Sequence, residues 1–254
     1  MENWDSYLKE YLCNRPLFLS VLRAKEAYLY KEYLPLVRPV LDYGCAEGFF
    51  AKVAWGGEID VGLDITNSRI SEVVRGVYKK VVTYNGRVIP FKNNYFGTAV
   101  SNSVLEHVDG VSKALFEINR VLKPKGKFLT TVMAAPWEDY LLGAKLFGKA
   151  YKDYMRKKQV HINLLKRREW DLLFKKAGFK IVKTIGHLDR GASGLIDFLH
   201  YVSIPSLISY KLTGKWVQFP KLADWIYPRR LLIKLTKKNV SPDEAGALFY
   251  ELEK

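Results

Sequence analysis

Residues 40–50, with the sequence VLDYGCAEGFF, constrain the fold of this chain more than any other stretch. The apolar residues before Asp42 predict a buried strand, and Gly44 and Gly48 predict a tight turn where the backbone can approach a ligand closely. Dinucleotide-binding folds open in a similar way, but their G-x-G-x-x-G spacing is not met, because Ala46 stands two residues after the first glycine. An ordinary βα turn that binds nothing is the other interpretation of this stretch.

A second apolar run, residues 58–64 (EIDVGLD), also ends in an acid, and this acid lies 22 residues after Asp42. In a βαβ unit an acid at that distance stands at the carboxyl end of the second strand, where its carboxylate can accept both hydroxyls of a ribose. Asp64 and the glycine turn therefore predict a site for a ligand that contains a ribose.

Five segments resemble, in order, the motifs of class I methyltransferases that use S-adenosylmethionine (SAM), and of the methyltransferase type 11-like group in particular. They are residues 40–50, 58–64, 85–91 (NGRVIPF), 99–107 (AVSNSVLEH) and 120–133 (RVLKPKGKFLTTVM). The resemblance covers about residues 36–190. Asn85 departs from the family's acid near the adenine amino group, although an amide oxygen can still accept that hydrogen bond. Gly97 departs from the acid usual after Phe96, which we interpret as a change where the strand begins and not as a lost ligand contact.

The resemblance implies SAM as the cofactor and a role for each matching residue. Asp42 is expected to hold the methionine amino group, and Asp64 to bind the ribose diol. Ile65 is expected to pack against adenine, Asn85 to reach the adenine edge, and Asn102 to line the methionine end. The expected cofactor-binding residues are Asp42, Gly44, Cys45, Gly48, Asp64, Ile65, Asn85, Gly86 and Asn102.

Predicted strands alternate with predicted helices, which favours a parallel sheet with helices on both faces. Strands are expected at residues 39–43, 59–64, 80–84, 97–101, 127–133, 180–187 and 246–253, and helices at 48–54, 67–76, 110–122 and 167–177. Residues 3–34 predict one or two further helices. With the resemblance, the expected fold is α/β: a doubly wound, mostly parallel, Rossmann-like sheet of seven strands whose last strand is antiparallel.

Three parts are expected along the chain. They are an N-terminal helical lid (1–35), the SAM-binding domain (36–190 with 243–254) and a helical, apolar and basic insertion (191–242). Residues 191–210 are long enough for a membrane-spanning helix, but Pro205, Asp197 and four serines argue against one. Residues 211–238 combine eight cations with aromatic side chains, which suits either an interfacial helix on anionic lipid or a helical cap with its lysines in water.

The chain has a net charge of +15, and the excess of cations is larger in residues 136–254. Such a field could attract RNA, an anionic membrane surface or acidic substrates. RNA is the weaker expectation, because no RNA-binding module or long arginine-rich run is recognisable. Cys13 and Cys45 indicate neither a disulfide framework nor a cysteine-ligated zinc site, so we expect no metal ion. The polar N-terminus predicts a cytoplasmic protein, with peripheral membrane association left open.

Methyl transfer to oxygen or nitrogen requires a base, and histidine is suited to that task near neutral pH. His107 follows the fourth motif's strand, and His161 precedes the helix that borders the acceptor side in this fold, so both are candidate catalytic residues. His187 and His200 are expected to be structural or surface residues. The sequence thus predicts a SAM-dependent methyltransferase acting on a small-molecule, lipid or glycan acceptor. An RNA methyltransferase and a non-catalytic SAM-binding regulatory module are the alternatives.

Overall fold

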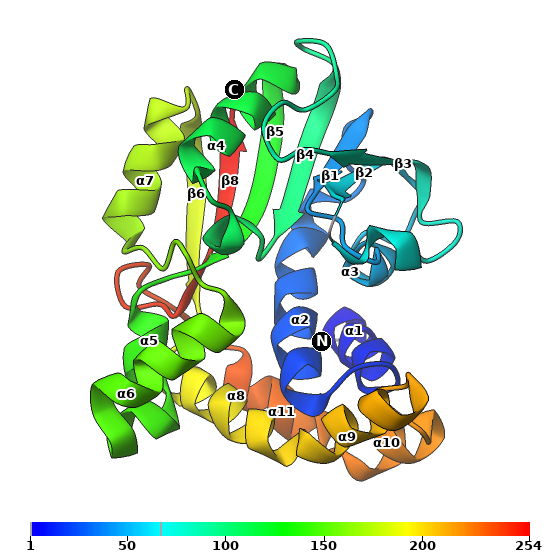
Figure 1. Ribbon diagram of the computed structural model, residues 1–254, viewed down its shortest axis with the longest axis vertical. Coiled ribbons are helices and arrows are strands. Elements are labelled where there is room, and N and C mark those ends of the chain that lie inside the picture. Colours follow the sequence, from blue (N-terminus) through cyan, green and yellow to red (C-terminus); the bar gives the residue numbers. More distant parts are fainter. Residues whose placement is uncertain (1, 67) are drawn as a thin grey trace.

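A single mixed sheet forms the upper part of the computed structural model in Figure 1. Within residues 2–66 and 68–254, which the structure describes, the sheet has eight strands in the order β3-β2-β1-β4-β5-β8-β6-β7. Neighbouring strands among β1 to β5 pair in parallel, whereas β8 is antiparallel to both β5 and β6. The strands are β1 (Val40–Tyr43), β2 (Ile59–Ile65), β3 (Tyr78–Tyr84), β4 (Phe96–Asn102), β5 (Leu122–Met133), β6 (Lys180–His187), β7 (Asn239–Val240) and β8 (Ala247–Glu253).

Helices cover both faces of this sheet. On one face α2 and α3 pack against the central strands, where Ala27 is buried with Val100 and Leu129. On the other face α4 and α7 do so, and Trp170 is buried there with Leu115. The helices are α1 (Glu2–Leu12), α2 (Leu17–Tyr30), α3 (Phe49–Ala54), α4 (Val111–Val121), α5 (Pro136–Tyr140), α6 (Leu142–Gln159), α7 (Arg167–Lys176), α8 (Arg190–Val202), α9 (Ile204–Thr213), α10 (Pro220–Ile226) and α11 (Arg229–Thr236), with 3-10 turns η1 (Lys31–Tyr33), η2 (Arg69–Glu72) and η3 (Leu105–His107).

The remaining helices gather beyond the carboxyl ends of the parallel strands, in the lower part of Figure 1. Their apolar sides form a second core, in which Leu8 of α1, Trp137 of α5 and Ile196 of α8 are buried together. Residues 191–210 are divided between α8 and α9 at Ser203. Over the part of the chain that the structure describes, no helix combines the length and the apolar character needed to cross a membrane.

The predicted fold class is confirmed, with two local differences. The predicted helix over residues 67–76 is wrong: residues 69–72 form only the turn η2, and Asn67 lies outside the described residues. After η2 the Val74 amide donates to the Glu47 carbonyl (2.9 Å), which holds the backbone against the glycine turn and not in a helix. The sheet also gains a strand that was not predicted, because β7 has only two residues and leaves no periodic pattern.

Gly97 lies at the start of β4, at the end of the strand opposite Asn102. A Cβ atom at this glycine would lie 2.8 Å from the carbonyl oxygens of both Val37 and Arg38. The Gly97 amide donates to the Pro39 carbonyl (2.9 Å), which keeps these two segments close. This packing supports the interpretation of Gly97 as a change where the strand begins, because an acidic side chain would meet backbone there.

Candidate active site

The glycine turn after β1 is built for close approach of a ligand. Gly44, Ala46 and Gly48 all have positive φ angles, of 78°, 44° and 73°. The amides of Gly44 and Cys45 both donate to the Leu63 carbonyl of β2, at 2.8 and 3.2 Å. A Cβ at Gly44 would lie 2.5 Å from the side chain of Val104, so any larger residue would have to displace this wall.

Asp42 is buried at the floor of this turn. The hydroxyl of Tyr78, at the start of β3, donates a short hydrogen bond to Asp42 Oδ2. Burial raises the pKa of Asp42 to about 7, while the Tyr78 hydrogen bond acts in the opposite direction. Among the described residues, no cationic side chain is hydrogen-bonded or ion-paired to Asp42. A ligand ammonium could therefore bind this carboxyl without displacing another cation.

Asp64 stands at the carboxyl end of β2, as predicted. Its Oδ2 accepts from the Ala46 amide and its Oδ1 from the Ile65 amide, both at 2.7 Å. These bonds fix the carboxylate while leaving each oxygen a further lone pair for a diol. Burial is the main cause that raises the pKa of Asp64 above its ordinary value. Ile65 beside it is 46% exposed and lies 3.7 Å from the position of a Cβ at Gly86.

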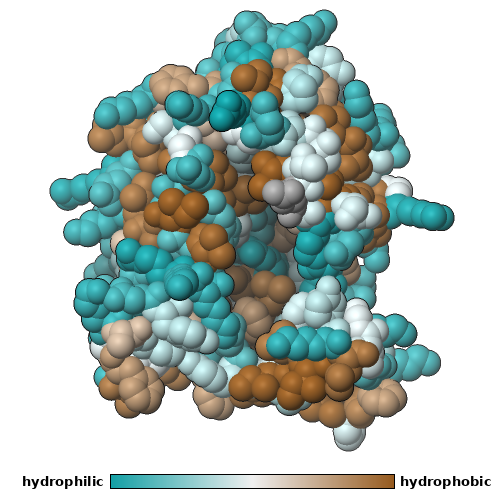
Figure 2. Space-filling model, in the orientation of Figure 1, coloured by the Kyte–Doolittle hydropathy of each residue, from teal (hydrophilic) through white to brown (hydrophobic). Residues whose placement is uncertain are grey.

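Three cavities with shared walls lie along the carboxyl ends of the strands. Figure 2 shows the molecule hollowed between the sheet and the lower helices. We name the three cavities after the roles that the sequence predicts for their residues. The cofactor cavity is lined by Asp42, Gly44, Cys45, Gly48, Asp64, Asn102, Ser103, Leu19, Arg23 and His107, among others. The adenine hollow beside it is lined by Gly44, Asp64, Ile65, Asn85, Gly86 and His107, among others. The acceptor pocket is lined by Phe18, Leu19, Leu22, Arg23, Ser103, Glu106, His107, Met133, Trp137, Met155, Gln159, His161, Ile196, Asp197 and His200.

Every residue predicted for the site therefore lies on a wall of one of these cavities, and His107 lies on a wall of all three. Cys45 is buried and packs toward Gly62, and burial raises the pKa of its thiol, which fits a packing role. The Asn85 side-chain oxygen accepts from the Arg87 amide (3.0 Å), which orients it within its turn. The assignment of these residues to a bound cofactor stays a prediction.

The part that α2 takes in this site was not predicted. Glu26 is fully buried, and its carboxylate accepts hydrogen bonds from the side-chain amide of Asn102 and from the Ser103 hydroxyl, both at 2.9 Å. It is also paired with Arg23 at 2.5 Å. Asn102 thus lines the cofactor cavity while its amide nitrogen is bound to α2, which fixes the end of β4.

The turn between α1 and α2 also reaches the cofactor cavity. Arg15 forms an ion pair with Glu47 of the glycine turn at 2.8 Å and stacks over the ring of Phe49 at 4.0 Å. The N-terminal helices therefore contact the cofactor cavity directly, as a covering segment would. Their action as a lid stays a prediction.

The candidate catalytic histidines lie next to each other on the wall of the acceptor pocket, with ring centroids 5.2 Å apart. His107 Nδ1 is hydrogen-bonded to the Val160 carbonyl at 3.0 Å. Burial lowers the pKa of His107 and lowers that of His161 to about 4, so both rings are neutral near pH 7. A neutral ring can accept a proton, but a pKa of about 4 makes His161 a weak base in the free protein.

The other two histidines differ from each other. His187 on β6 is fully buried, and within the described part of the chain neither ring nitrogen has a hydrogen-bond partner, in keeping with a structural position. His200 on α8 lies on the wall of the acceptor pocket, next to Lys158 at 3.3 Å and packed on Phe18. The sequence placed His200 away from the site, because nothing in its neighbourhood shows that α8 folds back over α2.

The polar groups of the cofactor cavity and of the adjoining adenine hollow fit SAM. They comprise a buried carboxyl at the glycine turn, a second carboxyl with free lone pairs at the end of β2, and an amide at the end of β3. A model of the methyltransferase domain family matches residues 4–184 of the chain. The chain belongs to the SAM-dependent methyltransferases. SAM is its cofactor, and when bound it supplies an electrophilic methyl group.

Several individual proteins are similar to this chain in sequence or in fold. An uncharacterised protein of Methanocaldococcus jannaschii is 33% identical over 187 residues, which cover 67% of this chain and 72% of that protein. A SAM-dependent methyltransferase of Thermotoga maritima matches 94% of this chain and 91% of its own with a TM-score of 0.59 and 19% identity. Phosphoethanolamine N-methyltransferase 2 of Haemonchus contortus, solved with SAM, matches 91% of this chain and 52% of its own with a TM-score of 0.56 and 18% identity. At these identities the solved structures show the fold alone.

Proposed function

We propose that this methyltransferase acts on a small-molecule, lipid or glycan acceptor that binds in the acceptor pocket. The observation that carries the proposal is that this pocket and the cofactor cavity share four wall residues: Leu19, Arg23, Ser103 and His107. A group in the acceptor pocket can therefore reach the methionine end of the cofactor cavity. Holding two reactants next to each other in this way supplies much of the acceleration in a transfer reaction.

The walls of the pocket indicate an amphipathic acceptor. Met133, Trp137 and Ile196 present apolar surface, and each is nearly fully buried. Polar and titratable groups line the same pocket, among them His107 and His161 as the candidate bases for the attacking atom. A lipid headgroup with part of its chain, or a small molecule of mixed polarity, fits such a lining.

We further propose that the insertion brings the protein to an anionic membrane surface on the cytoplasmic side. Several large apolar side chains of α8, α9, α10 and the connection between α9 and α10 are exposed, and side chains of this kind form much of the hydrophobic surface at the lower right of Figure 2. They are Phe198, Tyr201, Ile204, Ile208, Leu212, Phe219, Leu222, Trp225 and Ile226. Lysines at 211, 215 and 221 lie between them in sequence, and this mixture suits an interface of lipid headgroups and acyl chains.

The test of the acceptor is the formation of S-adenosylhomocysteine (SAH) with separate acceptor pools. Pools of total lipid, polar metabolites, oligosaccharides and RNA would be supplied with SAM to the wild type and to Trp137→Ala, which opens the acceptor pocket. Turnover with lipids or small molecules that Trp137→Ala reduces would support the proposal. Turnover with RNA alone, falling steeply with salt, would favour the RNA methyltransferase instead.

The membrane proposal has a separate test. Sedimentation with vesicles that contain phosphatidylserine would be compared for the wild type, Leu212→Glu with Trp225→Glu, and a control, Leu146→Glu. Leu146 is 77% exposed but lies on α6, away from α9 and α10. Binding lost in the double variant and kept in the control would support docking through the insertion. Equal sedimentation of all three proteins would contradict it.

A further inference from the structure

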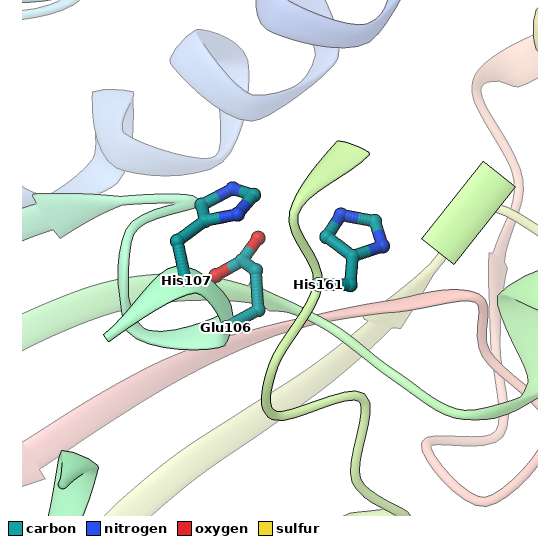
Figure 3. Close-up of side chains that lie close together, drawn as sticks. All are labelled: Glu106, His107 and His161. Atoms are coloured by element: carbon teal, nitrogen blue, oxygen red, sulfur yellow. The ribbon is translucent and has the colours of Figure 1, made fainter. Parts of the chain in front are cut away.

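Three ligand-type side chains converge where the acceptor pocket and the cofactor cavity meet. Glu106, His107 and His161 each offer one ligand atom, and these atoms all lie within 4.8 Å of one another. Figure 3 shows the Glu106 carboxylate beside His107, with the His161 ring approaching from the segment after α6. Two imidazoles and one carboxylate form a common ligand set for divalent transition metals, and such sites keep open positions for a further ligand.

The carboxylate of Glu106 is oriented but incompletely satisfied. The residue is fully buried, and its Oε1 accepts from the Met133 amide at 3.3 Å. Its Oε2 is buried and has no hydrogen-bond partner among the residues that the structure describes. A buried carboxylate oxygen without a partner is costly, so this atom points to a ligand that completes its environment.

The two histidines are also prepared to bind. A carbonyl oxygen only accepts, so the contact of His107 Nδ1 with the Val160 carbonyl places the ring proton on Nδ1. The lone pair of the neutral ring is then on Nε2. A backbone carbonyl bound to the far nitrogen is the usual partner of a metal-bound histidine, because it fixes the orientation of the ring. The His161 ring forms no hydrogen bond with any other residue that the structure describes.

The backbone holds these three residues together before any ligand is present. The amides of Ile162 and Asn163 both donate to the Glu106 carbonyl, at 2.8 and 2.9 Å. The Asn163 side chain also donates to the carbonyls of Leu105 (3.0 Å) and Val108 (2.7 Å). The segment after α6 is thus tied to η3 by four hydrogen bonds in addition to that of His107. A site supported in this way needs little reorganisation to bind.

Distance and charge are compatible with a divalent ion. Ligand atoms bonded at about 2.1 Å to one ion lie roughly 3.5 Å apart, so the side chains need to close by little more than 1 Å. Arg23 lines the same pocket, but it is paired with Glu26 at 2.5 Å. Arg23 is therefore directed to Glu26 and not to the three candidate ligands.

We propose that Glu106, His107 and His161 bind a divalent transition-metal ion, with Zn²⁺ as the first candidate, and leave an open position toward the acceptor pocket. The cysteines, on which the sequence-based expectation of no metal rested, take no part in this set. Binding of the ion does not depend on the proposed acceptor. Its use does: an ion in this place would act as a Lewis acid on an acceptor oxygen or nitrogen. In that state the ion takes over the activation of the acceptor from the two histidines, because their lone pairs are coordinated and cannot accept a proton.

The test is titration of Zn²⁺ into chelator-treated protein by calorimetry, together with Co²⁺ absorption in the visible range. One equivalent of Zn²⁺ should bind the wild type, and Co²⁺ should give the spectrum of nitrogen and oxygen ligands without a thiolate band. His161→Ala and Glu106→Gln should each weaken Zn²⁺ binding at least tenfold, because each removes a ligand. His200→Ala is the matched control, since His200 lines the same pocket outside the cluster, and its Zn²⁺ affinity should stay unchanged.

Two results would overturn the metal site: a folded wild type that binds no Zn²⁺, or equal Zn²⁺ affinity in Glu106→Gln and the wild type. Glu106→Gln keeps the shape of the side chain, so it decides the matter even where His161→Ala does not fold. SAH titration of every variant reports folding and the cofactor cavity separately. If no metal binds but SAH binding and turnover are intact, the metal site is refuted and the proposed function stands. If Zn²⁺ binds but no acceptor pool is turned over, the metal site stands and the proposed function is refuted.

Discussion

Replacing Tyr78 by phenylalanine should shift the pH dependence of SAM binding upward. Asp42 has its pKa raised to about 7 by burial, and the hydrogen bond from the Tyr78 hydroxyl opposes that rise. If Asp42 binds the methionine ammonium, it must be ionised in the complex. Below pH 7 the free carboxyl is protonated, so binding must release a proton and the affinity falls by up to tenfold for each pH unit. Above pH 7 the carboxyl is already ionised and the affinity levels off.

The size of the shift follows from the hydrogen bond that is removed. A hydrogen bond to a charged group contributes about 1.5–3 kcal/mol, and one pKa unit corresponds to about 1.4 kcal/mol. Without the Tyr78 hydroxyl, the pKa of Asp42 should therefore rise by about 1–2 units. At pH 7 the dissociation constant of SAM should increase on the order of tenfold, whereas well above the new pKa the two proteins should bind alike.

Calorimetric titration of SAH at pH values from about 5.5 to about 9 would measure this, in two buffers that differ in ionisation enthalpy, so that released protons are counted. The matched control is Tyr84→Phe, which removes the hydroxyl that donates to Tyr43 at 2.9 Å, without touching Asp42. The control should keep the wild-type pH profile. If Tyr78→Phe also keeps it, or if no proton is released below pH 7, Asp42 does not hold the ammonium group.

Three further outcomes are expected. Asp64→Ala should weaken SAH binding on the order of 100-fold, since two hydrogen bonds from a diol to a charged group are lost; an unchanged calorimetric affinity would show that the ribose binds elsewhere. Gly97→Asp, which restores the acid usual in the family, should cost about 1–3 kcal/mol through the clash with the Val37 and Arg38 carbonyls, and a melting temperature equal to wild type would refute that packing argument. Trp170→Ala should lower the free energy of unfolding by about 3–5 kcal/mol because its side chain is fully buried, as urea denaturation would measure; a loss below 1 kcal/mol would mean that the site collapses around the gap.

Those parts of the site that follow from chain order could be predicted. A strand, a glycine turn and a second strand ending in an acid place Asp42, Gly44 and Asp64 at one edge of a parallel sheet without any knowledge of the remainder. The same rule places Asn85 and Asn102 at the carboxyl ends of their strands, and all five lie on cavity walls. Because parallel strands end at the same edge of the sheet, residues that follow different strands come to lie close together.

The partners of these residues could not be predicted, because they come from distant segments. Tyr78 lies 36 residues from Asp42, and Glu26 lies 76 residues from Asn102. Neither pair has a spacing that a helix or a strand would reveal. The same holds for His200, which reaches the acceptor pocket only because α8 packs against α2. Side chains whose roles depend on tertiary packing leave no local pattern in the sequence.

The α2 helix lines both the cofactor cavity and the acceptor pocket. Its Leu19 and Arg23 form part of both cavity walls, and the Tyr30 hydroxyl, farther along the helix, is bonded to the Ser101 carbonyl at 2.7 Å. A ligand in either cavity would therefore contact the same helix. If SAM binding shifts α2, the affinity for the acceptor changes by some factor, and acceptor binding must change the affinity for SAM by the same factor. A shift of this one helix would thus couple the binding of SAM to the binding of the acceptor.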